Sequence, residues 1–107
     1  MQQRIYTIYD SKAEAYLKPF FTTTKGLALR SFIDESNKPG STLNMYPADY
    51  TLFELGTFED DTGQITMHKA HENLGTALEH IRTPQDHSIP PSNLQKLEGP
   101  TPIEKSI

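Results

Sequence analysis

The sequence contains no cysteine, so the chain has no disulfides, no cysteine ligands for a metal and no thiol nucleophile. Long apolar runs are absent too. None approaches the ~18 residues that a membrane-spanning helix needs, and the N-terminal MQQRIYTIYD lacks the apolar core of a signal peptide. We therefore expect a soluble protein that stays in the reducing compartment where it is made and has no membrane partner.

Apolar residues are scarce as well. They make up 35% of the chain, against roughly 45–50% in a typical domain when glycine is also counted. The 107 residues suit a single domain. A domain of this size buries only about 60–65% of its unfolded surface. The core should therefore be small, and dimerisation would be a natural way to bury more.

Basic residues are missing from the middle of the chain. Residues 39–67 carry five acidic side chains and no basic one, a net charge of −5, whereas residues 1–38 carry six basic and four acidic groups, a net of +2. The whole chain has a net charge of −4, which argues against attraction of the entire surface to nucleic acid or to an anionic membrane. A local basic face on the first third is compatible with this distribution.

Apolar residues that alternate predict three strands, and apolar residues three and four apart predict two helices. We expect one α+β domain over residues 1–83, with a small, mostly antiparallel sheet, two helices on one of its faces and the order β-α-β-β-α. If the first two strands were parallel neighbours, their crossover should be right-handed. The expected elements are strands at 4–9, 50–58 and 64–68 and helices at 25–37 and 74–82.

The segments between the expected strands and helices also contain residues that predict their local structure. Residues 12–21 have some helical spacing, but Pro19 disfavours a helix before it, so we expect a single turn followed by an extended Pro-Phe-Phe. Residues 39–49 are expected to form a loop. Residues 60–63 are typical of a hairpin turn whose glycine can take a positive φ. Gly56, in mid-strand, predicts a bulge or a close backbone contact.

The predicted core and the predicted tail complete the fold. The last 24 residues contain five prolines and few large apolar residues, so residues 84–107 are expected to form a flexible tail that packs little against the domain. The residues expected to meet in one core cluster are Ile5 or Ile8, Leu29, Phe32, Phe53, Leu55, Leu74 and Leu78.

Aromatic and basic residues alternate through the first third of the chain. Single-strand binders use this mixture, because aromatic rings stack on bases and cations follow the phosphates. The alternative interpretation is that the rings belong to the core and the cations are ordinary solvated surface. The candidate nucleic-acid-binding residues are Arg4, Tyr6, Tyr9, Lys12, Tyr16, Lys18, Lys25 and Arg30.

Other groups of residues give weaker evidence for a functional site. His68, His71 and His80 could supply imidazole ligands, but no carboxylate or thiol completes a recognised zinc spacing. The acidic run before Gly63 lacks the twelve-residue calcium pattern and its closing glutamate, so a solvated hairpin tip is expected there. Nucleophile-elbow and phosphate-loop patterns are absent. We therefore expect neither an enzyme nor a bound metal or cofactor.

Three short blocks, in order, resemble one known family. Residues 5–16 (IYTIYDSKAEAY) are similar to the opening of the small nonstructural protein of gokushovirus-type microviruses, which are single-stranded DNA phages; that family carries Tyr-Asp-Ser-Lys-Ala-Glu-Ala and an aromatic there. Residues 46–56 (YPADYTLFELG) match its Pro, acidic residue, Tyr-Thr-Leu-Phe and Leu-Gly, and residues 60–63 match the acidic turn that follows. Residues 73–79 (NLGTALE) are similar to its Ser-Leu-Gly segment.

The resemblance implies a nonenzymatic phage protein in the cytoplasm of a host bacterium. It brings no catalytic residues. It implies either binding of single-stranded viral DNA or of the replication complex during genome synthesis and packaging, or a protein-interaction module that contacts the replication initiator, capsid assembly or a host protein. A homo-oligomer fits both. Cations that converge on one face with exposed rings would favour the first function, and an exposed apolar face would favour the second.

Overall fold

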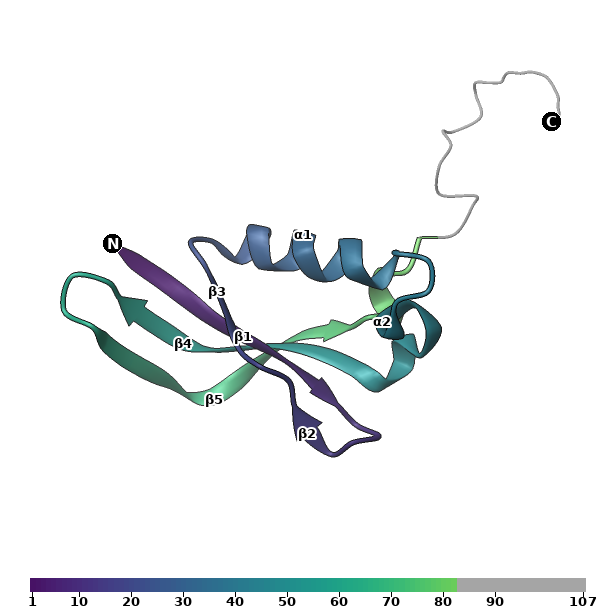
Figure 1. Ribbon diagram of the computed structural model, residues 1–107. Helices are drawn as coiled ribbons and strands as arrows, with labels where there is room; N and C mark the ends of the chain where they lie inside the picture. The colour runs from purple at the N-terminus through teal and green to yellow at the C-terminus, as the bar shows by residue number, and fades with distance from the viewer. Residues whose placement is uncertain (83–107) are drawn as a thin grey trace, which may run out of the picture.

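A computed structural model describes residues 1–82, in which an antiparallel sheet is crossed on one face by a single long helix (Figure 1). The predicted tail, residues 84–107, lies outside the described residues. Within residues 1–82, no helix is long and apolar enough to cross a membrane. The described part of the chain is therefore a small domain with a mostly antiparallel sheet, as predicted.

The sheet is built around its two central strands, β1 and β4. Its path is β2-β1-β4-β5, and β3 also pairs with β1. All pairings are antiparallel, including β1 with β4, so the parallel neighbours considered above do not occur. The strands are β1 (Gln2–Asp10), β2 (Ala15–Tyr16), β3 (Phe20–Thr22), β4 (Tyr50–Glu59) and β5 (Gln64–Thr76).

The long helix forms where it was predicted. Helix α1 (Lys25–Ser36) begins after Thr24, whose Oγ1 accepts a hydrogen bond from the backbone N–H of Leu27 at 3.2 Å. At the other end of the helix the side chain of Asn37 donates to the carbonyl oxygens of Ile33 and His80, and its Oδ1 accepts from the N–H of Arg82. Asn37 thereby ties the end of α1 to the end of the described chain.

The connection from α1 to β4 is more ordered than the loop predicted over residues 39–49. It contains a short helix, α2 (Thr42–Met45), and a 3-10 turn, η1 (Pro47–Asp49). Ser41 caps α2 by accepting a hydrogen bond from the N–H of Asn44 at 3.0 Å. Pro47 suits the first position of η1 because its φ is fixed and its missing N–H is not needed there. The expectation of a loop was therefore wrong for most of this segment.

The segment before α1 pairs with β1. The turn expected after β1 is the hairpin loop 11–14, stabilised by the carboxylate of Asp10, which accepts from the N–H groups of Lys12 and Ala13 at 3.0 and 3.3 Å. Pro19 is followed directly by β3, so the predicted extended Pro-Phe-Phe is confirmed.

The prediction of a second helix over residues 74–82 is wrong. Strand β5 continues to Thr76, which lies opposite Thr51 of β4, and only a 3-10 turn, η2 (Leu78–His80), follows. Asn73 does not cap a helix; its Oδ1 accepts from the N–H of Gly75 at 2.7 Å. Gly75 has a φ of 105°, which no α-helix contains. The element order β-α-β-β-α is corrected accordingly.

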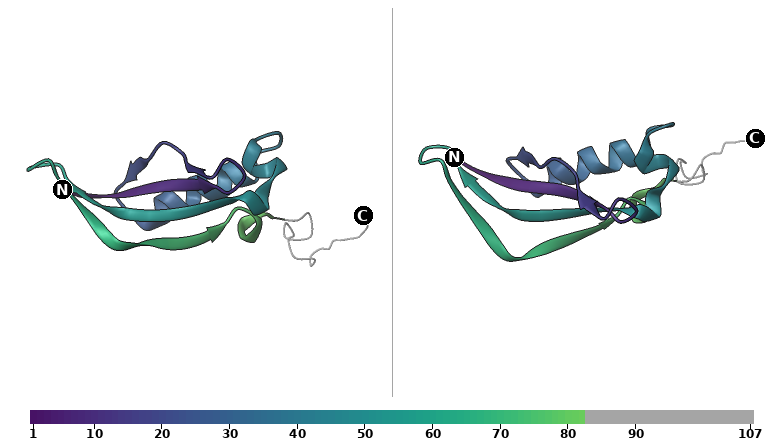
Figure 2. Two further views of the ribbon diagram at one scale, coloured as in Figure 1. Left: turned by 90° about the horizontal axis from the view of Figure 1, so that it is seen from below. Right: turned by 60° about the horizontal axis from the view of Figure 1, so that its bottom comes forward.

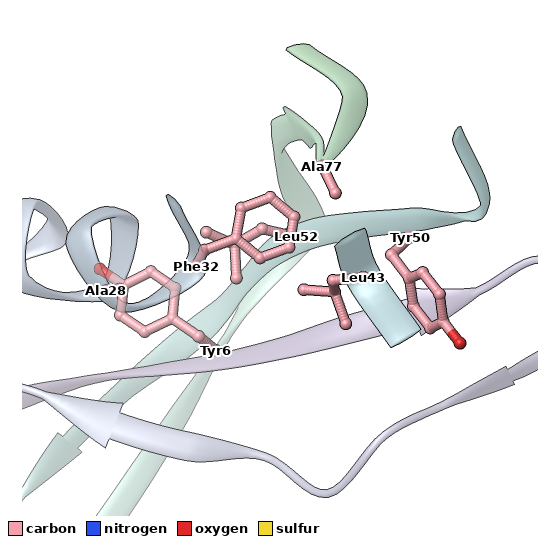
Figure 3. Close-up of a cluster of buried hydrophobic side chains, with 7 residues drawn as sticks. All are labelled: Tyr6, Ala28, Phe32, Leu43, Tyr50, Leu52 and Ala77. Atoms are coloured by element: carbon pink, nitrogen blue, oxygen red, sulfur yellow. The ribbon is translucent and has the colours of Figure 1, made fainter. Parts of the chain in front are cut away.

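The core lies between α1 and the sheet, and Phe32, 2% exposed, is at its centre (Figure 3). Leu29 and Leu74, both predicted core residues, pack partly against it, as does Ile8. For β4 the prediction assigned the wrong face of the strand to the core: Leu52 is buried under the helix, while Phe53 and Leu55 point away from it. Leu78, also predicted to be in the core, is exposed. The cluster consists of Tyr6, Ala28, Phe32, Leu43, Tyr50, Leu52 and Ala77.

Gly56 lies at an irregularity that involves β1, β4 and β5. The β1–β4 register shifts between Ile5 and Tyr6, and one residue of β4 between Glu54 and Gly56 faces residues 68–71 of β5. A Cβ on Gly56 would lie 2.2 Å from the carbonyl oxygen of Thr66. The predicted bulge and close contact are both present, and β5 bends along its length (Figure 2).

Candidate functional site

The sheet face that points away from α1 carries several large apolar side chains that remain partly exposed. We call it the open face. Strand alternation and register assign its members, and ring contacts and the lining of a groove agree with that assignment. Its apolar and aromatic residues, with Thr7, are Ile5 and Tyr9 of β1, Tyr16, Leu17 and Phe21 of the β2–β3 region, Phe53, Leu55 and Phe58 of β4, and Ile65, Met67 and His71 of β5. The register also places Gln3, Thr51 and Asn73 on this face.

The strands contribute no charged side chain to the open face outside residues 68–71 of β5. Alternation places the charges of the three long strands on the side that faces α1. Tyr6, which packs under α1, fixes which side that is. These charged residues are Arg4 and Asp10 of β1, Glu54 and Glu59 of β4, and Glu72 of β5.

Aromatic rings gather at both ends of the open face. At one end the ring of Tyr16 lies 4.8 Å from that of Tyr9, 6.1 Å from Phe53 and 5.6 Å from His71, centroid to centroid. At the other end Phe21 meets Phe58 edge to face at 5.7 Å. Tyr16 and Phe21 remain about half exposed, so each ring cluster has one ring that is accessible to solvent.

A groove of about 270 Å³ lies between the two ring clusters. The segment that joins β2 to β3 forms one wall, and the hydroxyl of Thr7 holds it in place by donating to the carbonyl oxygen of Leu17 at 2.6 Å. The groove is open to solvent. Its lining consists of Thr7, Tyr16, Leu17, Pro19, Leu55, Met67 and His71.

Three of the predicted nucleic-acid-binding residues face the helix side of the sheet. Tyr6 is fully buried in the core. Arg4 pairs with Glu54 at 3.1 Å and Lys25 pairs with Glu72 at 2.9 Å. These two cations are thus already neutralised by carboxylates, and the Tyr6 ring is inaccessible for stacking.

The other five predicted residues are more exposed but are not all together. Tyr9 and Tyr16 lie in one ring cluster of the open face. Lys12, in the β1–β2 loop, and Lys18, between β2 and β3, are exposed, and neither forms an ion pair within residues 1–82. Arg30 is exposed on α1, away from this cluster. The structure thus brings together two tyrosines with two lysines on adjoining loops.

A buried carboxylate that the sequence did not single out lies on the helix side. Glu54 is 1% exposed, and its Oε2 accepts from Arg4 at 3.1 Å and lies 2.7 Å from Nε2 of His68. Burial opposes ionisation of Glu54, but the hydrogen bond from His68, the nearby Tyr6 hydroxyl and the Arg4 charge lower its pKa below the ordinary value. Burial and the same carboxylate raise the pKa of Tyr6 to about 12.

The three histidines are spread over different parts of the domain. His68 contacts Glu54 on the helix side, His71 joins the rings of the open face, and His80 packs edge to face on Phe32. In the described part of the chain, no three histidine or acidic side chains are arranged to hold a metal ion. At the predicted hairpin tip, Gly63 has a φ of 76°, and Asp60 pairs with the N-terminal amino group.

These features define a small α+β domain: a sheet with one face covered by α1 and one open face that carries mainly apolar side chains. Comparison with protein families places residues 3–80 in the family described as Phage ORF5 protein. The chain belongs to this phage protein family. No curated protein and no solved structure matches it.

Proposed function

We propose that this phage protein is the small nonstructural accessory protein of a gokushovirus-type microvirus. All three resembling blocks, at residues 5–16, 46–56 and 73–79, lie within the segment that matches the phage family. The protein acts without catalysis in the cytoplasm of the host bacterium and requires no cofactor. Its contribution to phage growth is to bind another macromolecule.

We propose further that this macromolecule is a protein and that the open face binds it. The observation that carries this proposal is the combination of large exposed apolar side chains with an absence of charge from the strands outside residues 68–71 of β5. Leu17, Phe21 and Met67 are all between two fifths and three fifths exposed. Contiguous apolar patches on small soluble proteins mark interaction sites, and depletion of charge is typical of the centre of a protein–protein interface.

Binding of single-stranded DNA is the second candidate. Tyr16 is half exposed and flanked in sequence by Lys12 and Lys18, so one base could stack there while the lysines follow the phosphates. The dispersion of the predicted cations makes this candidate weaker. Arg4 and Lys25 are held by glutamates, and breaking those pairs would oppose binding. Two free lysines give little affinity for a polyanion.

Growth of a phage that encodes this chain tests the use of the open face. Met67 lies on the open face and Met45 on α2, and both are 54% exposed. Met67→Glu should abolish or strongly reduce plaque formation, because an interface that covers Met67 would bury the new carboxylate. Met45→Glu is the matched control and should form normal plaques. Equal growth of the two phages, with both proteins folded, would disprove a role for the open face.

A DNA titration separates the two candidates. The protein-interaction function predicts weak or no binding to single-stranded DNA even at low salt. The DNA function predicts binding that falls as salt rises and that is lost on changing Lys12 and Lys18 to glutamate. Strong salt-dependent binding of the wild-type chain would favour the second candidate.

A further inference from the structure

We infer that the partner on the open face is a second copy of this chain, packed face to face. This inference rests on the proposed protein-binding function and identifies its partner. The first argument is electrostatic. Each copy carries a net charge of −4, so two copies repel each other over most of their surfaces. The open face, which receives no charge from the strands outside residues 68–71, is the surface on which two copies meet with least repulsion.

The second argument is the area that remains uncovered. A fully buried aromatic side chain contributes roughly 150–250 Å², so the half-exposed rings of Tyr16 and Phe21 together leave on the order of 200 Å² for a partner. Leu17, Ile65 and Met67 are comparably exposed and extend the same patch. A standard interface buries about 800 Å² per partner, with an apolar centre and a polar rim. The open face has the composition and extent of such a centre.

The third argument is the layer structure of the domain. One face of the sheet is covered by α1, and no helix of the described residues covers the other (Figures 1 and 2). Two sheets that pack face to face bury both open faces in one core about 10 Å thick. The result is a four-layer assembly, helix–sheet–sheet–helix, which compensates for the small core of a single copy.

The rings at both ends of the open face allow the two copies to pack in antiparallel orientation, with rings meeting rings at each end. The Phe21–Phe58 pair and the cluster around Tyr16 lie at opposite ends of the open face, with the groove between them. A two-fold axis that lies between the two sheets, crosses the groove and runs perpendicular to the line joining the two ring clusters places the Phe21 end of each copy over the Tyr16 end of the other. Both contacts are then aromatic and identical, as two-fold symmetry requires. Near the axis, Met67 of one copy faces the groove of the other.

Sedimentation equilibrium on the full chain tests the inference. The wild type should approach twice the monomer mass of 12.1 kDa as concentration rises. Met67→Glu should weaken the dimer on the order of a hundredfold or more, since two unpaired carboxylates would be buried per dimer. Met45→Glu should leave the dissociation constant unchanged. A wild type that remains monomeric at every concentration, or a dimer that both variants leave intact, overturns the inference.

Because the chain has no cysteine, disulfide trapping reports the arrangement without background. A mixture of the Tyr16→Cys and Phe21→Cys variants should form the mixed disulfide dimer on oxidation, while each variant alone should remain uncrosslinked. Efficient crosslinking of each variant with itself, and none in the mixture, would overturn the antiparallel arrangement. Failure of both tests alongside a growth defect of the Met67→Glu phage would leave the protein-binding function standing, with a partner other than a second copy.

Discussion

The close approach of β4 and β5 at Gly56 can be tested by adding a single methyl group. Gly56 is buried, and the Cβ of an alanine there would lie 2.2 Å from the carbonyl oxygen of Thr66 and 2.9 Å from the Cα of Met67. Both atoms belong to the backbone of β5, so no side chain can rotate away. Gly56→Ala must therefore move one strand relative to the other.

The distance by which β4 and β5 must separate determines how much stability the substitution costs. Ordinary contact begins at 3.4 Å, so the gap must widen by 3.4 − 2.2, about 1.2 Å. Overpacking of this kind costs about 1–3 kcal/mol, and each ladder hydrogen bond that is lost adds about 1 kcal/mol. We expect a loss of about 3 kcal/mol or more in the free energy of unfolding. The melting temperature should fall by on the order of 10–20 °C.

The same substitution at Gly26 is the matched control. Gly26 lies in the first turn of α1, and the nearest atom to its added Cβ is Oγ1 of Thr24 at 3.9 Å. In a helix, glycine to alanine stabilises by about 0.5–1 kcal/mol, so Gly26→Ala should raise the melting temperature. Thermal and urea unfolding followed by far-ultraviolet circular dichroism measures both changes. A Gly56→Ala protein as stable as the wild type would refute the close packing of β4 on β5.

Three further predictions concern stability and binding. Phe32→Ala should cost about 3–5 kcal/mol, whereas Leu27→Ala, on the exposed side of the same helix, should cost under about 1 kcal/mol; equal urea midpoints would contradict the position of the core. The lowered pKa of Glu54 means that its charge stabilises the fold above the ordinary glutamate pKa and that this stabilisation is lost as pH falls through the lowered value. Glu54→Gln should therefore be less stable at neutral pH and lose less stability in acid; identical pH–stability curves would exclude this role. If single-stranded DNA does bind at Lys12 and Lys18, the log–log salt slope should be near −1.4, about 0.7 per phosphate contact; a slope several times steeper would show that other cations take part.

The parts of the fold that sequence could predict depend on strong local signals. Strand β1 alternates, α1 has an apolar stripe and a threonine cap, and the β4–β5 hairpin has an acidic turn with a glycine, so all three were predicted near their true positions. Gly56 predicted the bulge because a glycine in mid-strand typically marks a bulge or a close approach of another backbone.

The prediction of the second helix was wrong because pairing with a distant strand outweighed the helical spacing of the apolar residues. Residues 74–82 have apolar side chains at helical spacing, but the segment up to Thr76 pairs with β4, and the N–H of Ala77 donates to the carbonyl oxygen of Tyr50 at 2.9 Å. The missed signal was Asn73 two residues before Gly75, a spacing that favours an Asx turn at a glycine rather than a helix cap.

The candidate site could be predicted only in part, because β4 is apolar on both faces. Leu52 and Phe53 are equally good core residues by type, and alternation alone cannot say which faces the helix. Because Phe53 was assigned to the core, the open face was not predicted from the sequence. The neighbouring Glu54 was not singled out either, although Glu54 is buried. Tyr16 was among the predicted nucleic-acid-binding residues and lies on the open face; the neighbouring Leu17 and Met67 were not among the predicted site residues.

The pairing of β1 with β4 also has a consequence for how the chain folds. Gln2 lies opposite Glu59 and Asp10 opposite Tyr50, so β1 has no central neighbour until the chain beyond residue 50 has left the ribosome. The β4–β5 hairpin and α1, in contrast, are local and can form early. Closing β1 onto β4 spans a long loop, and topologies dominated by such contacts fold in milliseconds to seconds rather than microseconds. Insertion of β1 between the preformed hairpin and the β2–β3 segment is therefore expected to limit the folding rate, and until that step the apolar side chains of β1 remain accessible to chaperones.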